Sequence, residues 1–184
     1  MDSLQGHLLI ATPTLSDPNF FHTVVLLVQH GEEGALGLVL NRPLATPVSK
    51  VWEQVSDSAC LIEGNVFQGG PCEGPLMVVH GSGDASDLEV MPGVYFSTNR
   101  DAIEKLVESG ADPTRFFIGY AGWTAGQLEA ELASDSWLTV KADPAHLFDP
   151  PEDLWHDLHR QATRKAKAPS WIPPEIMPDD PSMN

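Results

Sequence analysis

Two histidines at the ends of apolar segments are the first residues in this sequence whose type and position suggest catalysis. His80 closes the run PLMVVH, His30 closes TVVLLVQH, and each precedes a glycine. Because imidazole titrates near neutral pH, either histidine could act as a general base, with Asp17 as its carboxylate partner. No G-x-S-x-G nucleophile motif accompanies them, and a strand-end histidine is more often a hydrogen-bonded structural residue. We therefore assign no catalytic residue and keep a hydrolase or transferase as an alternative.

Three polar or glycine-rich segments suggest a site for an anion instead. NRP (41–43) follows an apolar run, FQGGP (67–71) contains a double glycine, and GYAGWT (119–124) precedes a segment with helical periodicity. Arg42 could hold a carboxylate or phosphate through two parallel hydrogen bonds. The free amides of a helix N-terminus beyond Gly122 also favour anions. The candidate ligand-binding residues are Asn41, Arg42, Gly69, Gly70, His80, Gly119, Gly122, Trp123 and Thr124.

The same segments also allow a purely structural interpretation. The glycines fit neither the Walker A nor the GxGxxG pattern of nucleotide-binding loops. Glycines at 119 and 122 would let the chain turn sharply, and Thr124 and Gln127 match the T-x-x-Q pattern of a capping box. Arg42 could pair with one of 26 acidic residues. On this interpretation GYAGWT is a tight corner between a strand and a helix.

The charge of the chain restricts its possible partners. The 184 residues include 10 basic and 26 acidic side chains, and the net charge of −16 repels nucleic-acid phosphates and anionic lipid. Four cations fall between Arg160 and Lys167, where they complement the C-terminal dipole of a predicted helix. Direct nucleic-acid binding through residues 160–167 is therefore only a third hypothesis. No apolar run is long enough to span a bilayer.

Metal and thiol chemistry find little support in the sequence. Cys60 and Cys72 have no metal-ligand spacing, and His156 and His159 lie one helical turn apart without an HExxH motif. We therefore expect no metal and no cofactor. The N-terminus has no cationic region before an apolar stretch, which argues against a signal peptide. Two reduced thiols in this context indicate a cytoplasmic protein.

Apolar periodicity predicts one α+β domain over residues 1–167, with about seven or eight strands and four helices mixed along the chain. A strict βαβ alternation is absent, which argues against a doubly wound sheet. The predicted strands cover 6–11, 23–30, 35–41, 65–67, 75–80, a hairpin over 88–97, the segment from 115 to the GYAGWT corner, and 137–142. The predicted helices have N-caps at Thr46, at Ser97, Thr98 or Asn99, and at Thr124, and the last helix covers 151–167. Residues 168–184 contain five prolines and predict an extended or disordered tail.

Several segments together resemble a known bacterial family. They are GHLLIATPTLSDPNFFHTVVLLVQH, GALGLVLNRP, VFQGGP, PGVYFST and RFFIGYAGWTAGQLEAEL, and the combination is similar to the AlgH/YqgE family, also called UPF0301 or DUF179, over residues 4–165. The resemblance implies a cytoplasmic α+β protein whose coiled, mostly antiparallel and partly barrel-like sheet is flanked by helices. The signature positions carried over are Pro13, Asp17, Phe20, Thr23, His30, Gly37, Asn41, Arg42, Pro43, Gly69, Gly70, Pro71, Gly119, Gly122, Trp123 and Gln127. Cys72 stands where the family pattern has an apolar residue, commonly valine.

The resemblance supplies no catalytic set, because the biochemical activity of the family is largely unassigned. One branch takes its name from alginate regulation, yet no basic helix-turn-helix pattern appears here. We therefore predict a non-enzymatic binding or regulatory module for a small anionic ligand or a protein partner. Its site would be a cleft where the NRP, GGP and GYAGW segments meet, beside an opening that Trp123 leaves unfilled. A direct or indirect transcriptional regulator is the second alternative.

Overall fold

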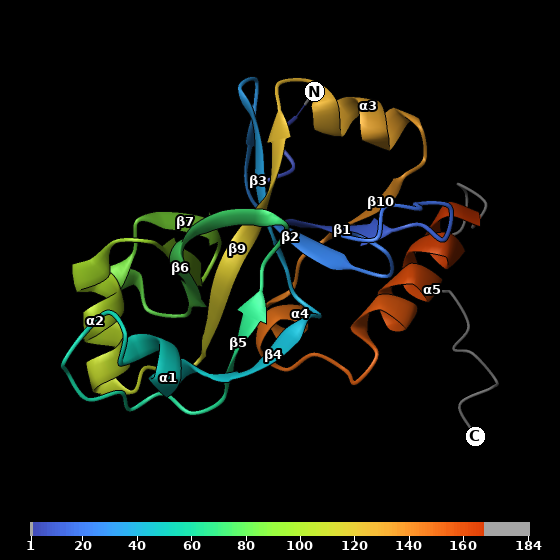
Figure 1. Cartoon of the computed structure of the whole chain (residues 1–184). Coiled ribbons are helices and arrows are strands. Elements are labelled where there is room, and N and C mark those ends of the chain that lie inside the picture. Colours follow the sequence, from blue (N-terminus) through green and yellow to red (C-terminus); the bar gives the residue numbers. More distant parts are fainter. Residues whose placement is uncertain (1, 168–184) are drawn as a thin grey trace.

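The computed structural model describes residues 2–167, which form one strongly twisted β-sheet with helices around it (Figure 1). The strands are β1 His7–Ala11, β2 Val24–Gly31, β3 Gly34–Val39, β4 Pro43–Pro47, β5 Asn65–Gln68, β6 Cys72–His80, β7 Leu88–Met91, β8 Val94–Ser97, β9 Thr114–Thr124 and β10 Trp137–Lys141. The helices are α1 Val48–Trp52, α2 Arg100–Ser109, α3 Gln127–Ala133, α4 Pro144–Phe148 and α5 Leu154–Lys167, with a 3-10 turn over Gly83–Ala85. The predicted tail over 168–184 lies outside the described residues. Within the described part, no helix is both long and apolar enough to cross a membrane.

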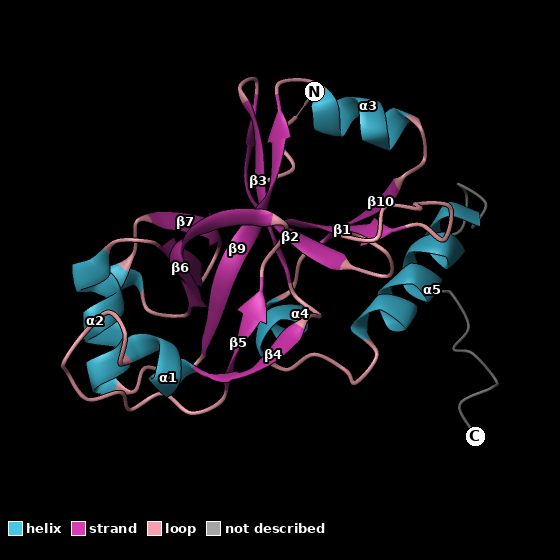
Figure 2. Cartoon of the chain, in the orientation of Figure 1, coloured by secondary structure: helices cyan, strands magenta, loops and turns pink. Residues whose placement is uncertain are grey.

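The sheet has the strand order β10-β1-β2-β3-β9-β6-β8-β7, and all neighbours along this path are antiparallel. β5 runs parallel to β9 and antiparallel to β4, so the sheet is mixed. Figure 2 shows the curved strands between α1 and α2 at one end and α5 at the other. Gln5 Nε2, just before β1, donates to the Glu89 carbonyl of the edge strand β7 at 3.0 Å. The curved sheet thus forms a half-barrel with helices around it, which confirms the predicted α+β class.

β9 connects the two halves of the sheet because three strands pair with it. Phe117 lies opposite Met77 of β6 on one edge and Phe67 of β5 on the other. Further along the strand, Ala121 lies opposite Gly37 of β3. A side chain at the start of β9 is therefore fixed relative to β5 and β6, and one near its end is fixed relative to β3.

The glycine-rich segment GYAGWT belongs to β9, so the predicted tight corner is wrong. The strand is continuous to Thr124, and only residues 125–126 form the turn. Gly126, at φ +75°, is the N-cap of α3, so a capping box closed by the Thr124 hydroxyl does not form. The Gln127 side chain does reach back, since its Oε1 accepts from the Thr124 amide at 3.1 Å. Strand pairing has overridden the local tendency of glycine to turn.

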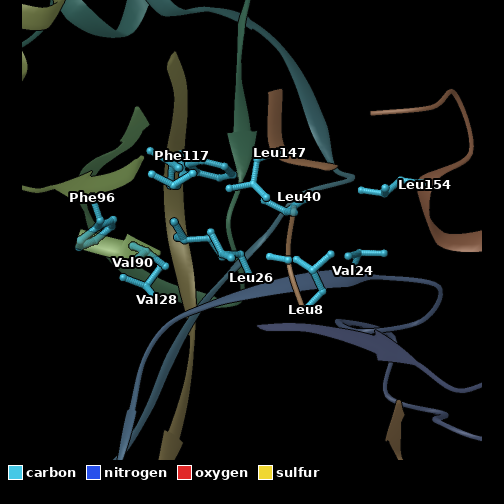
Figure 3. Packing of buried hydrophobic residues seen from close by; sticks show 14 of the residues in the cluster. Leu8, Val24, Leu26, Val28, Leu40, Val90, Phe96, Phe117, Leu147 and Leu154 are labelled. Carbon is cyan, nitrogen blue, oxygen red and sulfur yellow. The ribbon is translucent and has the colours of Figure 1, made fainter. Parts of the chain in front are cut away.

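The core consists of three hydrophobic clusters, and the largest extends from Val90 and Phe96 in β7 and β8 to Leu147 in α4 and Leu154 in α5 (Figure 3). Residues Val24–Val28 of β2 are fully buried, and alternate members belong to two different clusters. The predicted burial of this strand on both faces is therefore confirmed. The third cluster packs α1 and α2 against β6 and β9 through residues such as Trp52, Ile103 and Phe116.

The capping residues predicted from the sequence are confirmed for α2 and wrong for α1. Asn99 caps α2, with its Oδ1 accepting from two backbone amides, and Gly110 closes it at φ +62°. Both predicted hairpins, β2–β3 and β7–β8, are also confirmed. Thr46 is not a helix cap, because residues 43–47 pair with β5 as a strand and α1 begins only at Val48. The short α4, which Asp143 caps, was not predicted.

Candidate functional site

The side chains of the NRP segment hold the loop that precedes β2. Asn41 Oδ1 accepts from the first amide of β2 at 3.0 Å, and Asn41 Nδ2 donates to the His22 carbonyl at 2.8 Å. Arg42 Nη2 donates to the carbonyl oxygens of Pro18 at 3.2 Å and Phe21 at 3.4 Å. Among the described residues, no carboxylate pairs with Arg42. Two carbonyl groups of this loop thus bind Nη2 of the guanidinium considered for a ligand.

The loop held by the NRP segment contributes two rings to a continuous aromatic stack. The centroids of Phe21 and His22 are 3.9 Å apart, and those of His22 and Trp155 are 3.8 Å apart. His159 continues the stack at 5.0 Å from Trp155. Trp155 Nε1 also donates to the Ala11 carbonyl at 2.8 Å. The stack therefore attaches α5 to β1 and to the loop.

The GGP and GYAGW segments lie against each other, and their backbones fill the space between them. A Cβ on Gly69 would overlap the Gly119 carbonyl oxygen, and one on Gly70 would overlap the Tyr120 backbone. Gly119 adopts φ +75°, and a Cβ there would come 2.7 Å from the Gly70 carbonyl oxygen. The Trp123 side chain is only 5% exposed. These glycines allow two chain segments to approach closely, and the contact leaves them no Cβ-sized space.

Trp123 is fixed by an acidic residue of α3. Its Nε1 donates to Glu131 Oε2 at 2.9 Å, and Trp137 Nε1 donates to the same oxygen at 2.8 Å. The other oxygen, Oε1, accepts from Gln127 Nε2 at 3.1 Å. The amphipathic α3 thus closes over the end of β9 through one carboxylate that satisfies two buried indole groups.

The two candidate histidines have separate structural partners. His80 is fully buried, its Nδ1 accepts from the Ser82 amide at 3.3 Å, and its Nε2 donates to Ser97 Oγ at 2.9 Å. His30 Nδ1 accepts from an N-terminal amide at 3.0 Å, and its Nε2 donates to Glu129 at 3.0 Å. The Asp17 carboxylate accepts instead from a nearby amide of its own loop at 2.8 Å. The arrangement therefore assembles no histidine with Asp17 for catalysis.

The buried ring of His80 predicts an acid-dependent loss of stability. Burial lowers its pKa, against smaller opposing effects of the Ser82 amide and Asp87. As the pH falls, His80 is protonated in the unfolded chain before it is protonated in the folded one. The contribution of this residue to the free energy of unfolding is therefore fully present above about pH 6.5, and below that pH it falls by at most about 1.4 kcal/mol per pH unit. His80→Gln, which retains a donor for Ser97, should lose less stability between about pH 6.5 and 5. Urea unfolding of both proteins across this range measures the difference, and parallel curves would contradict the prediction.

A pocket that the sequence did not indicate lies at the start of β9. Its volume is about 300 Å³. It is bounded by the start of α1, the segment that leads into β5, the first residues of β9 and the end of α4. The lining residues are Val48, Ile62, Glu63, Gly64, Asn65, Phe67, Thr114, Arg115, Phe116, Phe148 and Pro150.

Arg115 is the cation of this pocket, and its side chain is 8% exposed. Nη1 donates to the Leu147 carbonyl at 2.8 Å, and Nη2 donates to the Leu40 carbonyl at 2.6 Å. The guanidinium carbon lies 3.9 Å from the centroid of the Phe67 ring. Figure 3 shows Leu40 and Leu147 beside each other near Phe117. Dipoles and an aromatic face, rather than an acidic side chain, therefore surround this charge.

The electrostatics of Arg115 favour an additional anion. No carboxylate pairs with it among the described residues. Burial lowers its pKa to about 10, so the group stays charged at neutral pH. Two of its five N–H donors are bound by carbonyl groups. The sequence offered one signal for this residue, a charged side chain at the start of the apolar strand RFFIGYAGWT.

The fold and the pocket together define the class of the molecule: an α+β half-barrel domain with a small arginine-lined pocket. A family model described as AlgH-like (DUF179) matches residues 8–167, and the chain belongs to that family. The resemblance inferred from the motifs is therefore confirmed.

Named relatives and solved structures agree with this assignment. The chain is 41% identical over 170 residues to a UPF0301 protein of Idiomarina loihiensis, covering 88% of this chain and 92% of that protein. It is 40% identical over 194 residues to a UPF0301 protein of Streptomyces avermitilis, covering 100% and 97%. The solution structure of the AlgH protein from Pseudomonas aeruginosa is similar, with 40% identity, 90% coverage of both chains and a TM-score of 0.73. A Corynebacterium diphtheriae protein at 20% identity, covering 88% of this chain and 87% of that chain, shares the fold with a TM-score of 0.71.

Proposed function

We propose that this protein is a binding module whose pocket around Arg115 takes a small anionic ligand. The observation that carries the proposal is the buried guanidinium, which lines a pocket and has no carboxylate partner among the described residues. Burial of a charge costs several kcal/mol unless partners compensate for it. The Leu40 and Leu147 carbonyls and the Phe67 ring compensate for part of this cost, and a bound anion would compensate for more of it.

The size and position of the pocket support a small molecule. A volume of about 300 Å³ lies at the lower end of the range for ligand sites in proteins. The pocket is also adjacent to the predicted NRP segment, since the Leu40 carbonyl that binds Arg115 directly precedes Asn41. The anion site expected between NRP, GGP and GYAGW is instead proposed in the pocket at the start of β9. A regulatory role and the cytoplasmic location expected from the sequence belong to this same proposal.

A titration followed by NMR tests the binding function. Acetate, benzoate and inorganic phosphate are added separately to the ¹⁵N-labelled protein at constant ionic strength. We expect at least one anion to shift Arg115 and its pocket neighbours more than Gly70 and Gly122. Arg115→Met should weaken that binding about tenfold or more, because the charge-assisted hydrogen bonds are lost.

Arg100→Met is the matched control, since it removes an exposed arginine outside the pocket. Circular dichroism of both variants checks that they fold. If none of the three anions shifts the pocket residues, the proposed function is wrong.

A further inference from the structure

We infer that the pocket selects a monocarboxylate with a flat apolar body, an inference that rests on the proposed binding function. The charges around the pocket carry the argument. Among the described residues that line it, Arg115 is the single cation and Glu63 is the single acidic residue. Phosphate near neutral pH carries more than one negative charge, and its sites usually combine several donors or cations. A monocarboxylate matches one guanidinium and meets less repulsion from Glu63.

The geometry of Arg115 suits a planar anion. A guanidinium is flat, and it can present two parallel N–H donors to the two oxygens of a carboxylate. The Leu40 and Leu147 carbonyls bind one hydrogen on each terminal nitrogen, so a ligand would have to use the remaining donors of the group. Phe67 covers one face of the group at 3.9 Å and closes that face to a ligand, so a carboxylate would approach at the edge of the guanidinium plane. That direction is the one in which paired hydrogen bonds form.

The other residues that line the pocket indicate that the ligand has an apolar body. Val48, Ile62, Phe116, Phe148 and Pro150 supply aliphatic and aromatic surface around the pocket. Its volume of about 300 Å³ is enough for a single aromatic ring with a short acidic arm. Benzoate and phenylacetate have this size and chemistry.

Calorimetry with benzoate, phenylacetate, acetate and inorganic phosphate at constant ionic strength tests this class of ligand. We expect the two aryl carboxylates to bind more tightly than acetate, and phosphate neither to bind nor to displace them. Glu63→Gln should tighten aryl carboxylate binding about two- to fivefold, because a like charge at the pocket is removed. Glu63 is exposed, so this variant should fold normally.

Glu108→Gln provides the control, since it removes the same charge from the exposed face of α2, away from the pocket. It should leave the affinity for aryl carboxylates unchanged. Equal affinities for wild type and Glu63→Gln would overturn the assignment of the ligand to this pocket. If phosphate binds in an Arg115-dependent manner and the aryl carboxylates do not, the ligand class is wrong while the binding module stands. If no probe binds, the proposed function fails as well.

Discussion

Gly69→Ala is expected to destabilise the fold strongly, because the added methyl group would overlap the Gly119 carbonyl oxygen. The clash cannot be relieved cheaply. The Gly69 amide donates to the Ile118 carbonyl at 2.9 Å, and its carbonyl accepts from the Val39 amide at 2.8 Å, so the backbone is held on both sides. Overpacking of a rigid contact costs about 3 kcal/mol or more, a large part of the stability of a domain. Urea unfolding and the yield of soluble protein measure the effect.

Gly31→Ala is the matched control for this prediction. A Cβ at Gly31 has no heavy atom within 4 Å, and the backbone is not in the left-handed region. We expect the variant to be neutral, or stabilised by up to about 1 kcal/mol because the unfolded chain loses freedom. A Gly69→Ala protein with the unfolding midpoint of wild type would show that the two segments separate more easily than their contacts imply.

Glu131→Leu is the substitution expected to have the second largest effect. It would leave the buried indole N–H groups of Trp123 and Trp137 without an acceptor. A buried donor without a partner costs about 1–3 kcal/mol, so the loss should reach about 2–6 kcal/mol. The Trp fluorescence spectrum should change with it, since both rings lie at the contact between α3 and the sheet.

Glu131→Gln separates the hydrogen bonds from the packing of this side chain. Its amide oxygen can still accept from both indole groups, while its NH₂ group faces the side chain of Gln127, which donates to Oε1 in the wild type. We expect no more than half of the destabilisation seen for leucine. Equal unfolding free energies for the two variants would show that the indole hydrogen bonds contribute little.

The sequence predicted those elements whose signals are local. The two hairpins follow from apolar runs around short turns, and α2 follows from Asn99 at one end and Gly110 at the other. The extent of β9 was mispredicted because Gly119 and Gly122 also fit a turn. The small size of Gly119 serves the approach of the Gly70–Cys72 backbone, which no local pattern records. β4 was not predicted for a similar reason, since its residues form a strand by pairing with the distant β5 and not because of a local pattern.

The pocket was missed because its central contacts join distant parts of the chain. Arg115 is held by carbonyl groups of Leu40, the residue after β3, and of Leu147 in the unpredicted α4. The sequence indicated Asn41 and Arg42, which directly follow Leu40, as ligand-binding residues, but it could not show that their side chains bind the loop before β2. The chemistry of a site can be judged from residue types, whereas its location depends on the strand order.

The position of β1 has a consequence for the way this chain is made. One edge of the strand pairs with β2, which follows soon after it, while the other edge pairs with residues 137–141 near the end of the domain. During synthesis on the ribosome, the edge of β1 that pairs with β10 has no partner until residues 137–141 have been made. Structures dominated by such distant pairings fold slowly, and their unpaired strands are open to other chains in the meantime. The nascent chain is therefore most prone to aggregation before β10 has been synthesised and has paired with β1.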